Sequence, residues 1–246
     1  MSEEFLRVKR LPPYVFSEVN AMKLSARSQG LDVIDFGMGN PDIQSPDHVV
    51  EKVIETIKNP KTHRYSVSRG INGLRQANAD YYNRRFGVEI NPQTETLVTL
   101  GSKEGFANLA MAITSPGDVV LVPNPSYPIH AYGFIIAGGA LRHLPVNSPA
   151  QMLQELKNAV AHCIPKPLAL VLNFPSNPTG QVVTLEFYEE VVEFCRNQGL
   201  WLLSDLAYAE VYFNNVRPPS ILQVKNAREI AIEFTSISKT YSMPGW

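Results

Sequence analysis

Lys239 stands in a stretch that would suit an amine nucleophile. It lies in Ser-Ile-Ser-Lys at residues 236–239, just after the apolar run 230–234, which predicts a buried strand. Burial at a strand end disfavours the charged ammonium form, and an uncharged amine can add to an aldehyde. The alternative is a solvated lysine in a helix that Ser238 caps. This stretch alone leaves both interpretations open.

Two other apolar runs end in loops that suit an anion and a planar ring. Ser102 and Lys103 follow the run 96–100 in a glycine-bearing turn that opens a helix, where free amide groups suit a phosphate. Tyr127 follows the run 119–122 in a turn that prolines stiffen, so its ring could stack on a planar ligand. An ordinary turn and a tyrosine in the core are the structural alternatives.

Two further runs end in an amide and a carboxylate. Asn177 follows the run 168–172, its amide could donate to a ligand oxygen, and its bond to the next proline favours a cis peptide. Asp205 follows the run 200–203, where a carboxylate must be paired, hydrogen-bonded or protonated. Tyr208 adds a hydroxyl three residues later. A polar turn and a helix cap are the alternatives here.

From about residue 46 onward, helical patterns alternate with these apolar runs. Runs that are apolar on both faces indicate strands covered by helices on both sides, so we expect an α/β fold with three layers and a mostly parallel sheet. Ligands of such sheets bind at the carboxyl ends of the strands. Three helices with one buried face are predicted from apolar spacing at Val50, Val53, Ile54 and Ile57, at Phe106, Leu109, Ala110 and Ile113, and at Tyr188, Val191, Val192 and Cys195.

Residues 1–45 have a different pattern and are expected to form an N-terminal arm and a segment of a smaller domain, with residues 46–246 as the large domain. An extended segment at 11–14 precedes a helix that Ser17 could cap and that runs to about Ser28. A short strand is predicted at 33–36, followed by a glycine-bearing loop at 37–42.

Composition favours a small-molecule ligand. The 246 residues are 44% hydrophobic, with a formal net charge of -1 and no basic block, which argues against nucleic acid or an anionic membrane as partner. Cys163 and Cys195 lack the spacing of a disulfide framework or a metal site, so no metal is expected. The sequence shows no signal peptide or membrane span, and we expect a cytoplasmic protein.

One ligand would use all five loops: pyridoxal phosphate. Its aldehyde needs an amine, which Lys239 offers, and its pyridine nitrogen needs a buried carboxylate, which Asp205 offers. The amide of Asn177 and the hydroxyl of Tyr208 suit its phenolic oxygen. Its phosphate would take donors from the hydroxyls of Ser102 and Ser236 and from the amide of Lys103.

The whole chain resembles the fold type I, class I and II aminotransferases. Ser-Asn-Pro-Thr-Gly at 176–180, Asp205 with Tyr208, and Ser-Ile-Ser-Lys at 236–239 match the signature of that family. Within it, the segments most similar to bacterial alanine (glutamate–pyruvate) aminotransferases are Leu-Pro-Pro-Tyr-Val-Phe at 11–16, Gly-Met-Gly-Asn-Pro-Asp at 37–42, Tyr-Ser-Val-Ser-Arg-Gly-Ile at 65–71 and Gly-Ser-Lys-Glu-Gly at 101–105.

The resemblance implies roles for individual residues. Lys239 would be the Schiff-base lysine and proton carrier, Asp205 the partner of the pyridinium, and Tyr127 the residue that stacks on the ring. Tyr65 would reach across a homodimer to the partner's phosphate. The remaining implied contacts are Asn177 and Tyr208 to the ring oxygen, Ser102, Lys103 and Ser236 to the phosphate, and Gly39, Tyr14 and Asn177 to the substrate.

The implied reaction belongs to amino acid metabolism: transfer of an amino group between alanine or glutamate and pyruvate or 2-oxoglutarate. Alternatives are an aspartate, diaminopimelate or aromatic aminotransferase, a C–S lyase, or an inactive ligand-binding module. In the family, Gly-Trp at 245–246 is followed by a phosphate-binding arginine and later by one that binds the substrate carboxylate. The sequence ends before both, so we expect a fragment of a longer enzyme with an incomplete large domain and little activity by itself.

Overall fold

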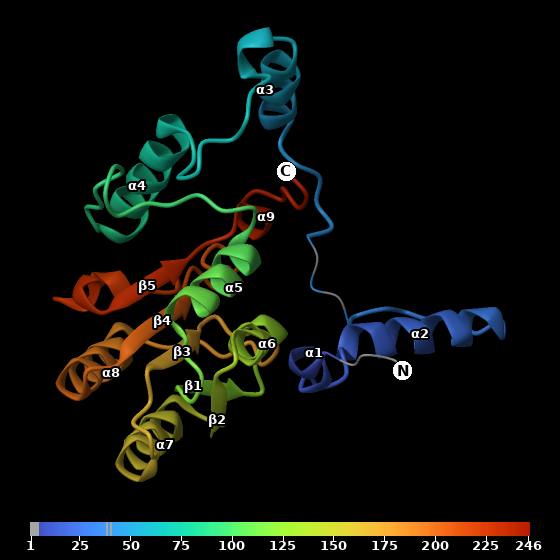
Figure 1. Cartoon of the computed structure of the whole chain (residues 1–246). Coiled ribbons are helices and arrows are strands. Elements are labelled where there is room, and N and C mark those ends of the chain that lie inside the picture. The colour runs from blue at the N-terminus through green and yellow to red at the C-terminus, as the bar shows by residue number, and fades with distance from the viewer. Residues whose placement is uncertain (1–4, 38, 40) are drawn as a thin grey trace.

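A five-stranded parallel sheet forms the centre of the computed structural model, which describes residues 5–37, 39 and 41–246 (Figure 1). The strand order is β2-β1-β3-β4-β5, and each neighbouring pair is parallel. The expected α/β fold with a parallel sheet is therefore confirmed. The strands are β1 Val119–Asn124, β2 Ala140–Pro145, β3 Ala169–Asn173, β4 Trp201–Asp205 and β5 Ala231–Phe234.

Four of these strands coincide with apolar runs of the sequence, and β2 does not. The runs 119–122, 168–172, 200–203 and 230–234 correspond to β1, β3, β4 and β5 with shifts of one or two residues at their ends. β2 lies at one edge of the sheet, and only Leu144 within it is buried. Arg142 and His143 interrupt its apolar run. Polar residues are tolerated there because an edge strand is less buried than a central one.

Two expected strands are wrong. Residues 96–100 and 33–36 are irregular, and Leu100 is 87% exposed. In the part of the chain that the structure describes, neither segment has a strand beside it to complete a backbone ladder. Without a neighbouring strand, the backbone N–H and C=O groups of an apolar run must find other hydrogen-bond partners. The amide of Val98, for example, donates to the carbonyl of Arg69.

Helices cover both faces of the sheet, as expected. Alternate strand residues point to opposite sides, and two core clusters follow from this. One cluster packs α7 (Pro149–His162) and α8 (Leu185–Gln198) on Leu121, Leu170 and Leu202; the other packs α5 (Ser102–Ile113) and α6 (Pro128–Ala137) on Val120, Val122, Val171 and Leu203.

The remaining helices are short or lie around these layers. Within the described residues they are α1 Leu6–Lys9, α2 Val15–Ser28, α3 Asp47–Ile57, η1 Pro60–Thr62, α4 Asn72–Phe86, η2 Ile221–Gln223, η3 Ala227–Glu229 and α9 Ile237–Thr240. The helix expected from Ser17 in fact begins at Val15, because Ser17 already donates its amide to the carbonyl of Tyr14. Each described helix is too short or too polar to cross a membrane.

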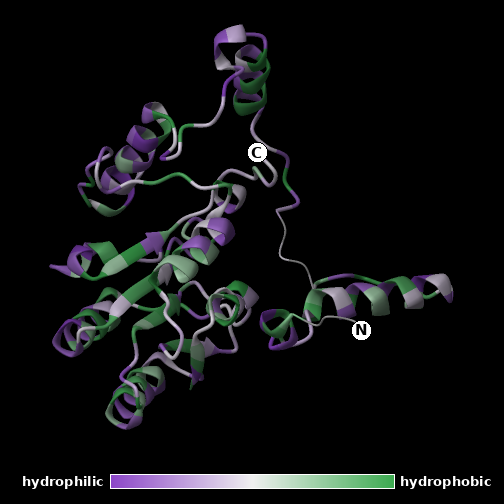
Figure 2. Cartoon of the chain, in the orientation of Figure 1, coloured by the Kyte–Doolittle hydropathy of each residue, from purple (hydrophilic) through white to green (hydrophobic). Residues whose placement is uncertain are grey.

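The buried faces expected for the helices around Phe106 and Tyr188 are confirmed, and the one expected for α3 is wrong. Phe106 in α5 and Tyr188 in α8 are buried, whereas Ile54 in α3 is 50% exposed. α3 stands apart from the sheet (Figure 1), and hydrophobic residues on α2 and α3 are visible in Figure 2. α3 contacts the adjoining η1, and its apolar residues Val50, Ile54 and Ile57 remain exposed. The division at residue 45 stays a prediction.

Candidate active site

A cavity of about 450 Å³ opens at the carboxyl ends of β3, β4 and β5. The carboxyl ends of parallel strands meet at one edge of a sheet, which brings loops far apart in sequence to the same place. All the predicted site residues except Tyr65 line this cavity: Tyr14, Gly39, Ser102, Lys103, Tyr127, Asn177, Asp205, Tyr208, Ser236 and Lys239. Met38 and Asn40, the neighbours of Gly39, lie outside the described residues.

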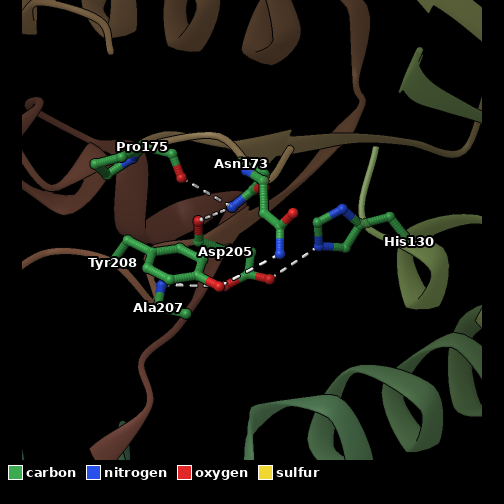
Figure 3. Close-up of polar contacts among 7 residues, drawn as sticks. His130, Asn173, Pro175, Asp205, Ala207 and Tyr208 are labelled. Carbon is green, nitrogen blue, oxygen red and sulfur yellow. Dashed lines mark hydrogen bonds and ion pairs between the residues drawn. The ribbon is translucent and has the colours of Figure 1, made fainter. Parts of the chain in front are cut away.

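Asp205 ends β4 with its carboxyl held on both oxygens. Its Oδ2 lies 2.9 Å from Nε2 of His130, and its Oδ1 accepts from the amide of Ala207 at 3.1 Å (Figure 3). Asp205 is 7% exposed. The prediction that a carboxylate at this strand end must be hydrogen-bonded is confirmed, and the group still faces the cavity.

His130 is the site residue that the sequence did not reveal. It lies on α6, is fully buried, and packs against the ring of Phe106 with 5.1 Å between ring centroids. An ionised carboxylate only accepts hydrogen bonds, so the His130 Nε2 that faces Asp205 carries the proton. Nδ1 is buried without a hydrogen-bond partner in the described residues. The only sequence signal was one polar residue within an apolar helix.

A chain of amide contacts joins the ends of β3 and β4. Nδ2 of Asn173 donates to the backbone oxygen of Asp205 at 2.9 Å, and Oδ1 of Asn173 accepts from the amide of Asn177. Nδ2 of Asn177 then donates to the hydroxyl of Tyr208 at 3.3 Å. Asn173 was also missed, because it only ends an apolar run. The peptide bond between Asn177 and Pro178 is cis, as expected.

Tyr208 keeps its hydroxyl proton in this setting. Burial raises its pKa above the usual value, although the hydrogen bond from Asn177 acts in the opposite direction. A neutral phenol can both donate and accept hydrogen bonds. The Asn177–Tyr208 pair therefore offers donors to a ligand oxygen that enters the cavity.

The start of α5 forms the anion-binding side of the cavity. Gly101, with φ of 85°, precedes the helix and adopts a conformation that favours glycine. The first amide groups of a helix have no partner within the helix, so those of Ser102 and Lys103 are available to an anion. α5 still provides this arrangement although residues 96–100, which lead into it, are irregular.

The sequence predicted a role only for the backbone amide of Lys103, but its side-chain ammonium also lies at the cavity. Its Nζ lies 5.2 Å from the centre of the Tyr127 ring. Burial acts to lower the pKa of Lys103, but hydrogen bonds with Tyr127 and Tyr14 outweigh it and raise the pKa. The side chain is therefore a stable cation at the cavity wall. Tyr132 holds the nearby N-terminal arm by donating to the carbonyls of Pro12 and Pro13, both at 3.1 Å.

Lys239 lies on α9, one short loop beyond β5. It is partly buried and faces the cavity with Ser236 and Ser238. The residue that precedes α9 is Ser236, and its side chain makes no capping bond. Within the described chain, the Lys239 side chain has no hydrogen bond or ion pair. The alternative of a lysine in a helix capped by Ser238 is therefore wrong.

Tyr65 lies apart from the cavity and is fully exposed. A contact of Tyr65 with a phosphate would need a second subunit, so this role stays a prediction. The described residues contain no cluster of three or more side chains of the types that bind metals.

The donor set fits pyridoxal phosphate. A buried carboxylate backed by His130 suits a cationic ring nitrogen, and the Asn177–Tyr208 pair suits the ring oxygen. The start of α5 suits the phosphate, and the amine of Lys239 suits the aldehyde.

Comparison with known proteins gives a consistent result. The chain is 59% identical to the putative aminotransferase AatC of Rhizobium meliloti (strain 1021), 49% to the glutamate-pyruvate aminotransferase AlaC of Escherichia coli (strain K12), and 44% to an LL-diaminopimelate aminotransferase of Desulforudis audaxviator (strain MP104C). These matches cover 99%, 98% and 99% of this chain, but only 60%, 59% and 62% of the relatives. The chain thus spans about three fifths of the length of its curated relatives.

A solved structure and a family model agree with these relatives. The fold is similar to that of a Thermus thermophilus aspartate aminotransferase mutant, with a TM-score of 0.89 and 30% identity over 100% of this chain and 63% of that one. The family model for aminotransferase class I and II matches residues 31–246. The chain belongs to the class I and II aminotransferases, a family that depends on pyridoxal phosphate.

Proposed function

We propose that the protein transfers amino groups between alanine or glutamate and pyruvate or 2-oxoglutarate. The observation that carries the proposal is the meeting of Lys239, Asp205 and the Asn177–Tyr208 pair in one cavity. An amine, a buried carboxylate and ring-oxygen donors in one place are what transamination with pyridoxal phosphate requires.

Each residue has one task in this proposal. Pyridoxal phosphate, when bound, supplies an aldehyde that bonds to amines and a cationic ring that stabilises a substrate carbanion. Lys239 would hold that aldehyde and, once displaced, carry a proton to and from the substrate α-carbon. Asp205, oriented by His130, would keep the ring nitrogen protonated, and Tyr127 would pack on the ring.

The other residues would orient the cofactor and the substrate. Asn177 and Tyr208 would hold the ring oxygen, while Ser102, Ser236 and the amide of Lys103 would hold the phosphate. Gly39, Tyr14 and Asn177 would line the substrate side. All of these residues face the cavity.

The cation of Lys103 beside Tyr14 supports glutamate as one of the substrates. Its ammonium lies against Tyr127 at the cavity wall, where it can pair with a side-chain carboxylate of a substrate. The relative named glutamate-pyruvate aminotransferase fits this choice. A relative named LL-diaminopimelate aminotransferase supports diaminopimelate as the alternative donor.

A homodimer in the cytoplasm is part of the same proposal. The exposed Tyr65 supports the dimer, because it could only contact a phosphate from a second subunit. The free thiols of Cys163 and Cys195 support a reducing compartment.

Trapping of the cofactor on Lys239 tests the proposal. The purified chain is incubated with pyridoxal phosphate, reduced with borohydride, and analysed by intact mass and peptide mapping. We expect one cofactor per chain on the peptide with Lys239, none in Lys239→Ala, and full labelling in Lys225→Ala, which removes an exposed lysine. Labelling of Lys239→Ala at the wild-type level would refute the proposal.

The choice of amino donor needs a separate measurement. Spectra of the protein as its gene encodes it are followed after addition of alanine, glutamate, aspartate or diaminopimelate. We expect alanine and glutamate to change the visible band fastest. A faster change with diaminopimelate would favour the alternative donor.

A further inference from the structure

Glu233 is a carboxyl that the proposed reaction does not use. It lies on β5, six residues before Lys239, and points to the face of the sheet opposite to Phe234, which packs against Phe106 of α5. Ser204 of β4 pairs with Glu233 across the parallel ladder, and Asp205 pairs with Phe234. The strand that leads to the lysine is thus aligned with the strand that ends in the aspartate.

Four donors from three elements converge on this carboxyl. The hydroxyl of Ser204 donates at 2.9 Å, that of Tyr82 in α4 at 3.0 Å, and the amide of Ile221 in η2 at 3.2 Å. The hydroxyl of Ser220, next to η2, is the fourth donor. In the part of the chain that the structure describes, Glu233 has no ion pair, so these neutral donors are what stabilises the carboxyl.

The carboxyl of Glu233 ties β5 to more of the fold than the backbone ladder does. The only strand neighbour of β5 among the described residues is β4, through four residue pairs. The side chain of Glu233 adds bonds to α4 and η2 that the backbone ladder lacks. Past Phe234 the chain continues for two residues and enters α9, which carries Lys239.

We propose that Glu233 is a positioning residue: its carboxyl holds β5 against β4, α4 and η2, and thereby sets the place of Lys239 relative to Asp205. The effect of Glu233 on catalysis rests on the proposed function, in which Lys239 binds the cofactor. The structural claim about β5 and α9 stands independently of the cofactor.

Hydrogen exchange followed by mass spectrometry tests the structural claim without cofactor. Glu233→Gln keeps the size of the side chain but removes its charge, and Glu229→Gln makes the same change at an exposed residue paired with Arg196. We expect amides of residues 235–241 to exchange about tenfold faster in Glu233→Gln, because the glutamine NH2 group replaces an oxygen that accepts from these donors and leaves a donor facing donors. Exchange in α8 should not change, and Glu229→Gln should match wild type.

The pH midpoint of the visible band of bound pyridoxal phosphate provides the second readout. We expect this midpoint to shift in Glu233→Gln and not in Glu229→Gln, since the amine of Lys239 has moved relative to Asp205. Trapping of cofactor on Lys239 in wild type shows separately whether the proposed function holds.

Two results would overturn the proposal: unchanged exchange at 235–241 in Glu233→Gln, or equal acceleration in α8, which indicates general destabilisation. If Glu233→Gln does not fold, Ser220→Ala decides the question. It removes one donor to the carboxyl, and the same two comparisons apply to it.

Discussion

His130 and Asp205 form the contact on which the proposed binding of a cationic ring depends. Asp205 lies in a buried site where an isolated charge would be costly, and His130 donates to one of its oxygens at 2.9 Å. The pairing keeps the carboxylate oriented and leaves it facing the cavity. Asp205, which the sequence predicted as a site residue, is thus oriented by His130, which the sequence did not reveal.

Replacement of that histidine should weaken cofactor binding. His130→Leu fits the surrounding apolar side chains but removes the donor to Asp205. We expect the affinity for pyridoxal phosphate, measured by spectroscopic titration, to fall by about 10- to 100-fold, the usual effect of losing a hydrogen bond to a charged group. The control is His143→Leu, at an exposed residue of β2. Affinities within twofold of each other would contradict this role of His130.

Lys103 should distinguish acidic from neutral substrates. Lys103→Met keeps much of the length of the side chain and removes its charge. We expect the half-reaction with glutamate to slow by about tenfold or more relative to that with alanine, because a substrate carboxylate loses its cationic partner. The ratio of the two rates in the protein as its gene encodes it is the measurement. Equal losses for both substrates would assign Lys103 to the cofactor alone.

Among the elements, α8 and α3 have similar apolar spacing but different burial. Val192 in α8 is buried in the core cluster beneath the sheet, whereas Val50 in α3 is 37% exposed. Helix amphipathicity predicts that a face is apolar, but not what covers it. The same substitution, valine to alanine, can therefore be compared at a buried and at an exposed position.

Val192→Ala should destabilise the fold by about 2 kcal/mol, because buried methyl groups are lost and a cavity remains. Val50→Ala should change the free energy of unfolding by about 0.5 kcal/mol or less. Urea unfolding of both variants provides the comparison. Equal losses would mean that α3 is packed against another surface in solution.

Glu233 should make the stability of β5 depend on pH. Burial raises the pKa of its carboxyl, despite the donors Ser220, Ser204, Tyr82 and Ile221. The titratable groups that face it are the phenols of Tyr82 on α4 and Tyr188 on α8, and burial raises the pKa of both. Neither phenol titrates with the carboxyl, so Glu233 is the group that responds in acid.

Because the pKa of Glu233 is higher in the folded than in the unfolded state, its protonated carboxyl favours folding. This contribution is complete below the unfolded-state pKa of about 4.3 and is lost as pH rises through the folded-state pKa. Wild type should therefore lose its stability advantage over Glu233→Gln as pH rises from acid toward neutral. Urea unfolding at several pH values measures this difference. An advantage that grows with pH would contradict the sign.

For the whole molecule, the position of Tyr65 makes a homodimer testable. Tyr65 is exposed and distant from the cavity of its own chain. If each site takes Tyr65 from one subunit and Lys239 from the other, a mixed dimer of two defective variants contains one complete site.

Mixing Tyr65→Ala with Lys239→Ala should therefore restore activity that neither variant has alone, up to about a quarter of wild type for random subunit exchange. Subunits of the gene-encoded protein are exchanged in mild denaturant and assayed after dilution. Each variant refolded alone is the control. No recovery, with dimers verified by sedimentation, would place Tyr65 outside the site.

The sequence alone determined the features that depend on neighbouring residues. The apolar runs of β1, β3, β4 and β5 and the periodicity of α5 and α8 are local patterns, and they predicted the layers of the fold. The chemistry of Asn177, Asp205, Tyr208 and Lys239 was also visible, because each follows such a run and strand ends of a parallel sheet converge.

Tertiary structure alone decided the features that depend on distant partners. Residues 96–100 have strand-like composition but no strand beside them in the described chain, and β2 is a strand despite its polar residues because β1 pairs with it. His130 meets Asp205 across 75 residues of sequence, and Glu233 meets Tyr82 across 151. Periodicity tells which residues share a face, but only the packed fold determines which faces are buried and which residues meet.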